Sequence, residues 1–433
     1  MTSEVIAWTA PYAAVPTSGR VAVAGSKSLM ARALVLAAIA DGPSTITNAL
    51  RSRDSLLMAE ALRSLGHDVD ADGTTWTVRP GSRDGDTFVE CGLSGTVMRF
   101  IPPLATLRAG TTRFDGDEHA RTRPMAPLLD GLRQAGAHIR GNVLPIEVAG
   151  AGALRGGEVR IDARASSQFV SGLLMGAARF EGGLALELVD DVPNRGHIRM
   201  STDALRERGV RVHETSTGGW VVEPGPVRAL DVTIEPDASN SAPFLCAAAA
   251  TGGEVTIGHW PQDTAQPIRR LLEVLTQFGT QTSFTGDEIT VRGVQRRGID
   301  VDLADIGDMT PAIAAMCLAA DEPSRIRGVA YIRGHETDRL RALRVELSKL
   351  GATVTETEDG LIIDPHPLHA ADLQTYADHR MVHAAAVAGL LVAGVRIDNV
   401  ATTAKAMPQF AALWSQLVTG DASLAPHVSE MAR

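Results

Sequence analysis

Six segments of the chain share one order of apolar and polar positions: a small polar opening, an Ala-rich apolar stretch, a turn and a short alternating run. Stretches that are apolar on most faces predict buried helices, and alternating runs predict strands. The spacings between successive openings are 68, 72, 73, 69 and 70 residues. Such regularity is typical of an internal repeat. The openings are Ser26, Ser94, Ser166, Ser239, Asp308 and Asp378.

A second pattern recurs in the same phase, in which an amphipathic helix ends in glycine and a short alternating strand follows. Glycine just after a helical run is the expected left-handed cap. Each unit therefore predicts helix, strand, helix, strand, strand. The closing glycines are Gly66, Gly136, Gly209, Gly279, Gly351 and Gly420.

The sixth unit is short, with only 13 residues after Gly420. We expect its missing strand to come from the N-terminus, where EVIAWTA is typical of a strand. Three units then form each of two lobes of an α/β (α+β) fold. The first lobe is predicted to span 20–228, and the second to combine 1–19 with 229–433. The chain would cross between them near Pro16–Arg20 and near Pro224–Asp231.

Composition limits the class of protein. No apolar run reaches the roughly 18 to 20 residues that a membrane-spanning helix needs, and the N-terminus lacks the pattern of a signal peptide. The three cysteines, Cys91, Cys246 and Cys317, are far apart and form no CxxC pair. These features predict a soluble cytoplasmic protein. The net charge of −10 argues against a nucleic-acid partner.

Lysine is rare among the 41 basic residues, since only Lys27, Lys349 and Lys405 are lysines. Lysine offers a compact charge with a tunable pKa, which arginine does not match. We expect Lys349 to be a solvated residue of an amphipathic helix. Lys27 lies at a helix opening and Lys405 in a loop before a helix, so both are candidates for chemistry.

The first three openings are rich in hydroxyls and cations. Helix N-termini bind anions through unpaired amides and a partial positive charge. Plain capping with solvated charges remains the alternative at each opening. The candidate residues there are Lys27, Ser28 and Arg32, then Gly95 with Arg99 behind it, Arg121 and Arg123 in a loop, and Ser166, Ser167 and Gln168.

The later openings add carboxylates. Asp308 is either a helix cap or a general base among cations. The stretch Arg333–Arg339 carries five ionisable groups in seven residues. His379 and His383 form an HxxxH pair, but no carboxylate lies between them as in metalloprotease motifs, so a metal site is not expected. The opening at Asp237–Ser241 predicts capping rather than catalysis.

Seven motifs, in order along the chain, resemble those of the EPSP synthase family (3-phosphoshikimate 1-carboxyvinyltransferases). They are GSKSxxxRAL at 25–34, LSGTVMRF at 93–100, RP at 123–124, SSQF at 166–169, RGHETDRL at 333–340, YADHRM at 376–381 and TTAK at 402–405. The resemblance implies a monomer with a two-lobed fold of six βαβαββ repeats. It also implies transfer of the enolpyruvyl group of phosphoenolpyruvate to the 5-hydroxyl of shikimate 3-phosphate, with no metal or organic cofactor, in a cationic cleft between the lobes.

The resemblance also implies a role for individual residues. Asp308 accepts the hydroxyl proton, Glu336 donates the proton to C3, and Lys27 and His335 assist. Shikimate 3-phosphate is expected to contact Lys27, Ser28, Arg32, Ser166, Ser167, Gln168, Asn194, Asp308 and His335. Phosphoenolpyruvate is expected to contact Lys27, Gly95, Arg123, Gln168, Arg339, Arg380 and Lys405.

The chain departs from the family pattern at a few positions. His335 stands where many members have lysine, which predicts an activity more sensitive to pH between 6 and 8. Asn194 stands where a phosphate-binding serine is usual, and Ala24, Met30 and Ala31 replace the usual residues around the first opening. Gly95 leaves room for glyphosate, so we expect inhibition by it.

Two other functions are compatible with the pattern. UDP-N-acetylglucosamine 1-carboxyvinyltransferases share the fold and chemistry, but they usually carry a reactive cysteine in a loop that here, at Asp115–Arg123, has none. A paralog that binds without catalysis, or that acts on a related cyclic acid in specialised metabolism, is the other. Phosphate release from the two substrates would separate these possibilities.

Overall fold

The repeated sequence pattern folds into six small sheets within residues 5–428, the part of the chain that this computed structural model describes. Five sheets have four strands and one has three. In each four-stranded sheet the first two strands pair in parallel and the remaining pairs are antiparallel, as in the order β6-β7-β9-β8. In three of these sheets a helix connects the parallel pair directly along the chain, as α3 connects β6 to β7, and in all five a second helix leads to the antiparallel hairpin. The predicted βαβαββ repeat is therefore confirmed.

The first lobe, Gly25–Ile234, holds three repeats. Its first repeat comprises β14 (Val232–Thr233), α1 (Lys27–Ala38), β3 (Ser44–Thr47), α2 (Arg53–Ser64), β4 (Asp68–Asp70) and β5 (Thr75–Arg79). The next comprises β6 (Thr87–Glu90), α3 (Gly95–Ala105), β7 (Ala109–Asp115), the 3-10 helix η1 (Glu118–Thr122), α4 (Ala126–Gln134), β8 (His138–Arg140) and β9 (Ile146–Ala151). The third comprises β10 (Gly157–Ile161), α5 (Ser167–Ala177), β11 (Leu184–Leu188), α6 (Arg195–Glu207), β12 (Val212–Glu214) and β13 (Trp220–Val222).

The second lobe combines Met1–Ala24 with Glu235–Arg433. Its first repeat comprises β2 (Gly19–Val21), α7 (Ala238–Thr251), β15 (Glu254–Ile257), α8 (Ile268–Phe278), β16 (Thr280–Thr285) and β17 (Glu288–Gly293). The next comprises β18 (Asp300–Asp302), η2 (Gly307–Met309), α9 (Thr310–Met316), η3 (Cys317–Ala319), β19 (Ser324–Arg327), η4 (Ala330–Gly334), α10 (Arg339–Ser348), β20 (Thr353–Glu356) and β21 (Leu361–Asp364). The last comprises β22 (Asp372–Leu373), α11 (His379–Gly389), β23 (Arg396–Ile397), η5 (Val400–Lys405), α12 (Phe410–Thr419), η6 (Ala422–Leu424) and β1 (Trp8–Thr9).

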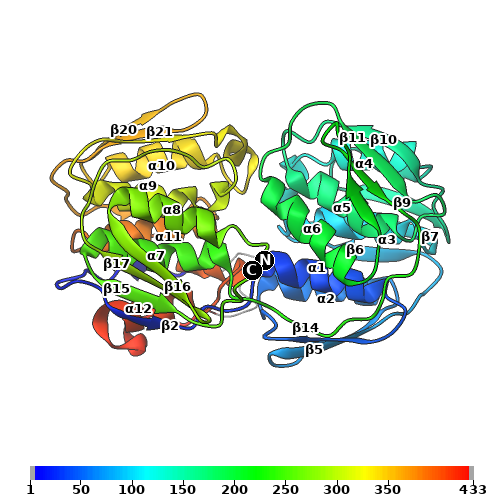
Figure 1. The fold of residues 1–433 in the computed structure, drawn as a ribbon, viewed down its shortest axis with the longest axis horizontal. Helices are drawn as coiled ribbons and strands as arrows, with labels where there is room; N and C mark the ends of the chain where they lie inside the picture. Colours follow the sequence, from blue (N-terminus) through cyan, green and yellow to red (C-terminus); the bar gives the residue numbers. More distant parts are fainter. Residues whose placement is uncertain (1–4, 429–433) are drawn as a thin grey trace. The chain divides into compact units, whose positions relative to one another are not determined.

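Three strands lie in sheets far from their place in the sequence. β1 pairs with β23, the position that the N-terminal segment was expected to fill. β2 precedes α1 but pairs in parallel with β15, beside which it lies in Figure 1. β14 precedes α7 but pairs in parallel with β3. The lobes therefore divide at 24–25 and 234–235, later than the expected boundaries at 20 and 228.

The predicted helix ends recur in the structure. Serines cap α1, α3 and α5 at the predicted openings, and Asp378 caps α11. At the fourth opening, Asp237–Ser241, the predicted capping is confirmed, because the side chain of Asp237 accepts from the amide of Asn240 at the start of α7. Asp308 lies in η2 and makes no capping bond. All six closing glycines have a positive φ, as a left-handed cap requires.

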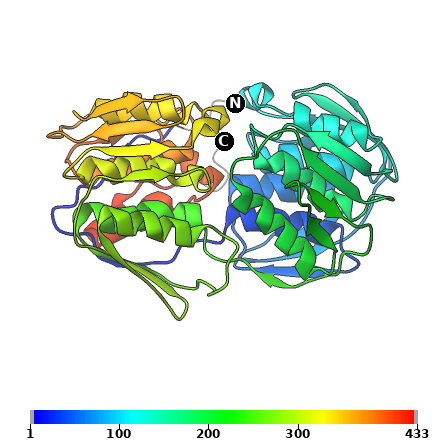
Figure 2. The same ribbon diagram turned by 45° about the horizontal axis from the view of Figure 1, so that its top comes forward.

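Each lobe has its own hydrophobic core. The first helix of each repeat is buried along nearly its whole length, as α7 shows, where the residues from Ala238 to Ala250 are buried apart from Ser239. The second helices bury one face, as predicted. Figures 1 and 2 show the helices of each lobe side by side, with the sheets around them.

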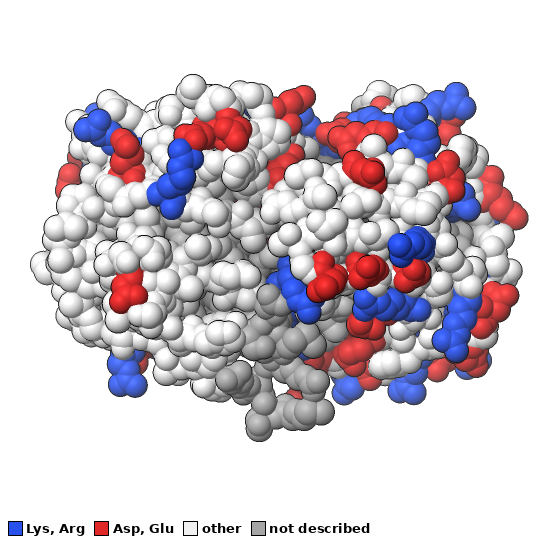
Figure 3. All heavy atoms as spheres, turned by 90° about the horizontal axis from the view of Figure 1, so that it is seen from below, with Lys and Arg blue, Asp and Glu red and all other residues white. Residues whose placement is uncertain are grey.

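The surface offers no broad basic region on the face shown in Figure 3, where acidic and basic side chains are interspersed. This arrangement fits the net charge of −10. None of the helices in the described residues has the length and apolar character needed to cross a bilayer.

Candidate active site

Lys27 is the first residue of α1 and faces a buried carboxylate. Its Nζ lies 3.2 Å from Oδ2 of Asp54, in the first turn of α2. The hydroxyl of Ser26 caps the same helix by accepting from the amide of Leu29. A cation and a helix N-terminus are thus together at this end of the first lobe, as an anion site requires.

Arg32 is buried beneath the opening of α1 and donates only to neutral oxygens. Its guanidinium bonds the carbonyls of Ser28 and His197 at 2.7 Å each, the hydroxyl of Ser201 at 2.8 Å and that of Ser171 at 3.4 Å. Burial lowers the pKa of Arg32 to about 9. Because these partners carry no negative charge, an anion at this opening would stabilise the charged guanidinium.

Gly95 begins α3 under the ends of three polar side chains. A Cβ at Gly95 would lie 2.7 Å from Nη1 of Arg99, 3.0 Å from Oε1 of Gln168 and 3.1 Å from Nη1 of Arg123. Arg99 donates to Gln168 at 3.1 Å, and Arg123 donates to the carbonyl of Leu93 at 3.2 Å. Nε of Arg123 is buried without a hydrogen-bond partner. Because glycine has no Cβ, these three side-chain ends can lie this close to the backbone of α3.

The other candidates of the first lobe lie either at helix N-termini or in an exposed ion pair. Ser166 caps α5 by accepting from the amide of Gln168 at 3.2 Å, and Ser167 is the first residue of that helix. Asn194 stands at the N-cap position of α6 in the left-handed conformation, but its buried Oδ1 has no hydrogen-bond partner and does not cap the helix. Arg121 instead forms an exposed ion pair with Asp115 at 2.9 Å. The structure therefore leaves Arg121 outside the group of cations around Gly95.

Arg339 is the centre of a buried charge cluster in the second lobe. Its guanidinium donates to Asp378 at 2.7 and 3.2 Å, to Asp308 at 2.9 Å and to Glu336 at 2.8 Å. Its Nη1 also lies 2.8 Å from Nδ1 of His335. The carboxylates outweigh burial and raise the pKa of Arg339 above its ordinary value. The ammonium of Lys405 donates to Glu336. The cluster therefore joins five of the predicted residues, namely Asp308, His335, Glu336, Arg339 and Lys405.

Asp308 is held in its ionised form. Burial raises the pKa of this carboxyl, but the guanidinium groups of Arg339 and Arg380 lower it further, and the net result lies well below the usual range. Nδ1 of His335 lies 3.5 Å from Oδ1 of Asp308. Arg339 donates and has no acceptor, so Nδ1 of His335 accepts in that contact.

Arg380 lies in the first turn of α11, just after its cap Asp378, and belongs to a second hydrogen-bond network. Its amide donates to Oδ1 of Asp378, and its Nη1 donates to Oδ1 of Asn240 at 2.9 Å. Asn240 is fully buried and donates to the carbonyl of Ala406 at 3.1 Å, next to Lys405. Asn240 thus links two predicted cationic residues, although its opening was predicted only to cap.

The sequence comparisons agree with the seven motifs. The profile of EPSP synthase (3-phosphoshikimate 1-carboxyvinyltransferase) matches residues 12–414. The chain belongs to the EPSP synthase family. A 3-phosphoshikimate 1-carboxyvinyltransferase of Kocuria rhizophila is 48% identical over 428 residues, covering 95% of this chain and 96% of the relative. One of Mycobacterium ulcerans is 47% identical over 427 residues, covering 96% and 99%.

A solved structure shares the fold. EPSP synthase from Acinetobacter baumannii superposes with a TM-score of 0.79 at 23% identity, over 95% of this chain and 98% of that one. The predicted two-lobed fold of the EPSP synthase family is thereby confirmed.

Two residues of the EPSP synthase motifs, Arg99 and Asp378, were assigned no substrate or catalytic role, although Arg99 was a candidate at its opening. Arg99 stands four residues after Gly95 in LSGTVMRF, so it lies on the same helix face. Asp378 opens the last repeat, and its role as a partner of Arg339 depends on a contact across 39 residues. Spacing could have indicated the first residue, but no local signal indicates the second.

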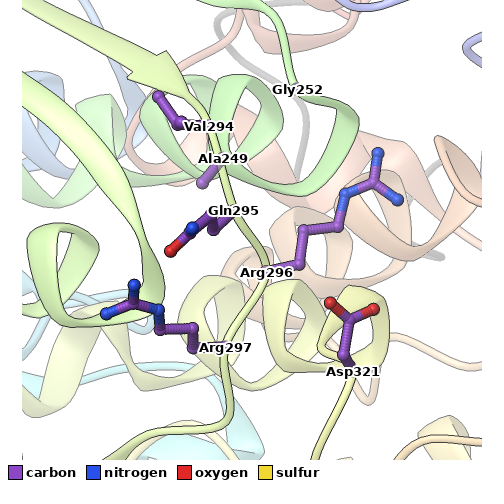
Figure 4. A pocket seen from close by; sticks show the side chains of 7 residues that line it. All are labelled: Ala249, Gly252, Val294, Gln295, Arg296, Arg297 and Asp321. Atoms are coloured by element: carbon purple, nitrogen blue, oxygen red, sulfur yellow. The ribbon is translucent and has the colours of Figure 1, made fainter.

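Other features lie outside these clusters. The second lobe has a hollow of about 590 Å³, and none of the predicted residues of an EPSP synthase site lines it. Figure 4 shows the side chains around this hollow. It is bordered by Gln295, Arg296, Arg297 and Asp321. Within residues 5–428, no group of three or more His, Cys, Asp or Glu side chains is arranged to hold a metal ion.

Proposed function

We propose that the chain transfers the enolpyruvyl group of phosphoenolpyruvate to the 5-hydroxyl of shikimate 3-phosphate. The products are 5-enolpyruvylshikimate 3-phosphate and phosphate. The observation that carries the proposal is that Asp308 and Glu336 are both hydrogen-bonded to Arg339. The reaction needs one group to take a proton from a hydroxyl and another to give one to carbon. The two carboxylates on one guanidinium supply both.

Asp308 takes the first role. Its lowered pKa keeps it ionised at neutral pH, as an acceptor for the hydroxyl proton must be. The 5-oxygen then bonds to C2 of phosphoenolpyruvate while C3 gains a proton. A base with so low a pKa is weak, so its catalysis depends on position more than on proton affinity.

Glu336 takes the second role together with Lys405. The ammonium donates to this carboxylate, so a transferable proton is present at the pair. C3 receives it during addition. When the C2–O bond to phosphate breaks, C3 returns a proton to the same pair and the double bond forms again, and the departing phosphate takes up the hydroxyl proton held by Asp308.

The cations take the role of binding the two anions. For phosphoenolpyruvate we assign Lys27, Gly95, Arg123, Gln168, Arg339, Arg380 and Lys405. For shikimate 3-phosphate we assign Lys27, Ser28, Arg32, Ser166, Ser167, Gln168, Asn194, Asp308 and His335. Arg32 and Arg123 donate to neutral oxygens, so an anion adds to them directly. Arg339 and Lys405 already contact carboxylates, so there an anion must exchange partners.

We further propose that the chain acts as a monomer in the cytoplasm, without a metal or an organic cofactor. The monomer and the cofactor-free reaction follow from the family resemblance. The three cysteines are buried and unpaired, as is usual in a reducing compartment. Among the described residues nothing favours a paralog that binds without catalysis.

The test is a coupled assay of phosphate release. We expect release only when both substrates are present, and a loss of at least about 100-fold in kcat for Asp308→Asn and Glu336→Gln, as for general acids and bases elsewhere. Asp203→Asn is the control, because Asp203 forms an exposed ion pair with Arg206 on α6. Tight binding of both substrates without turnover by the unaltered protein would refute the proposal.

A further inference from the structure

Two consecutive residues before Asp378 adopt a conformation that L-residues seldom take. Tyr376 has a φ of 53° and Ala377 a φ of 55°, and neither is glycine. Such left-handed residues persist only when the surrounding structure holds them, and they concentrate at functional sites. The residue that they present, Asp378, caps α11 and holds Arg339.

Glu346 is the group that holds this turn. Its Oε1 accepts from the hydroxyl of Tyr376 at 2.5 Å, and its Oε2 accepts from the amide of Gln374 at 2.9 Å and from Nζ of Lys349 at 2.6 Å. The carboxylate is buried. Burial and the neighbouring Glu346 raise the pKa of Tyr376 to about 12, so the phenol remains a donor at neutral pH.

Helix α10 carries both anchoring groups. Arg339 is its first residue and Glu346 follows seven positions later, two turns along the same face. Residues 374–378 are therefore fastened to one helix at both ends, through Glu346 at one and Arg339 at the other. Between them, the amide of Thr375 donates to Oδ1 of Asp398 at 2.9 Å.

We propose that Glu346, with Tyr376 and Lys349, is a positioning network that sets Asp378 against Arg339 and so orients the guanidinium for phosphoenolpyruvate. The inference rests on the proposed function for the role of Arg339. It revises the expectation for Lys349, which donates to a buried carboxylate rather than only to solvent. None of the three network residues needs to touch a substrate.

Helix α8, which corresponds to α10 in the preceding repeat, carries an ordinary surface ion pair for comparison. On α8, Arg270 and Glu273 form an ion pair at 2.8 Å, and the Glu273 side chain is 61% exposed. Glu346 differs because its side chain is only 3% exposed and it accepts from three donors. A pair like that on α8 contributes little to stability or geometry. Glu273→Gln is therefore a matched control.

The experiment compares Tyr376→Phe, Glu346→Gln and Glu273→Gln in the full chain. We expect Tyr376→Phe to raise KM for phosphoenolpyruvate about tenfold, within the roughly hundredfold loss that misplacement of a binding group can cause. KM for shikimate 3-phosphate should change less than KM for phosphoenolpyruvate, because seven of its nine assigned ligands lie in the first lobe and only Asp308 and His335 contact Arg339. Glu346→Gln should have the larger effect, and Glu273→Gln none.

Amide hydrogen exchange of residues 374–378 gives a readout that does not depend on catalysis. We expect faster exchange there in Tyr376→Phe, with the rest of the second lobe unchanged. Unchanged exchange and unchanged KM in a folded Tyr376→Phe protein would overturn the proposal, and so would a lower Tm alone. If Glu346→Gln does not fold, Tyr376→Phe decides.

Arg339→Gln separates this proposal from the proposed function. If that variant keeps the KM of the unaltered protein for phosphoenolpyruvate, the assignment of Arg339 to this substrate fails, and the orienting role fails with it. If its KM rises but Tyr376→Phe behaves as unaltered, the assignment of Arg339 stands and only the positioning network is wrong.

Discussion

The guanidinium of Arg339 holds both carboxylate oxygens of Asp378, with Nε 2.7 Å from Oδ2 and Nη2 3.2 Å from Oδ1. Both side chains are almost completely buried. Removing one partner of a buried ion pair leaves an uncompensated charge and costs about 3–5 kcal/mol. We therefore expect Asp378→Ala to lower the free energy of unfolding by about that amount in urea titrations. Asp378→Asn should cost less, because an amide oxygen still caps α11. Equal stability of both variants and the unaltered protein would show that Arg339 finds other partners.

The lowered pKa of Asp308 predicts how the stability of the protein depends on pH. Because the folded pKa lies below the ordinary value, the carboxylate contributes stability above the unfolded pKa of about 3.9. That contribution is lost as the pH falls through the folded pKa. The difference in unfolding free energy between the unaltered protein and Asp308→Asn should thus be constant from pH 7 to about pH 5 and shrink below about pH 4. Unfolding curves at several pH values measure it, and a difference that grows on acidification would contradict the expectation.

His335 predicts a pH dependence of activity. Its Nδ1 accepts from Arg339 and lies near Asp308, so adding a proton to the ring would change both contacts. Imidazole groups ordinarily titrate near neutrality and ammonium groups far above it. We expect kcat/KM to vary between pH 6 and 8 in the unaltered protein and to vary less in His335→Lys. Profiles that coincide across this range would remove His335 from the chemistry.

Local patterns predicted much of the fold because capping and turn formation are local. Ser26, Ser94 and Ser166 cap helices where small polar residues precede apolar runs. Long-range contacts could not be predicted in this way. Ser28 and Arg32 are four residues apart and so share a helix face, but no spacing indicates that Arg32 reaches Ser201, which is 169 residues away. For the same reason the exchanged strands β2 and β14 shifted the expected boundaries of the lobes.

Asn240 illustrates a site residue that only the fold reveals. Its amide accepts from Arg380 and donates to the carbonyl of Ala406. Asn240→Leu keeps the branching at Cγ but leaves two buried polar groups unsatisfied, at a cost of about 1–3 kcal/mol each. We expect a lower Tm and a higher KM for phosphoenolpyruvate. Asn240→Asp retains the acceptor, so its KM should lie nearer that of the unaltered protein. If Asn240→Leu lowers Tm without changing KM, Arg380 does not depend on this amide.

Gly95 gives the sharpest steric prediction in the first lobe. The Cβ of Gly95→Ala would lie within 3.1 Å of the ends of Arg99, Gln168 and Arg123. These are side-chain ends rather than backbone, so they can move and the fold should persist, with less than about 1 kcal/mol lost. Their displacement should raise KM for phosphoenolpyruvate and weaken inhibition by glyphosate, because Gly95 is assigned to phosphoenolpyruvate and is expected to leave room for glyphosate. Steady-state kinetics with and without glyphosate measure both effects. Thr96→Ser, which only shortens the next side chain, is the control. Unchanged KM and inhibition in a folded Gly95→Ala protein would place both ligands away from the opening of α3.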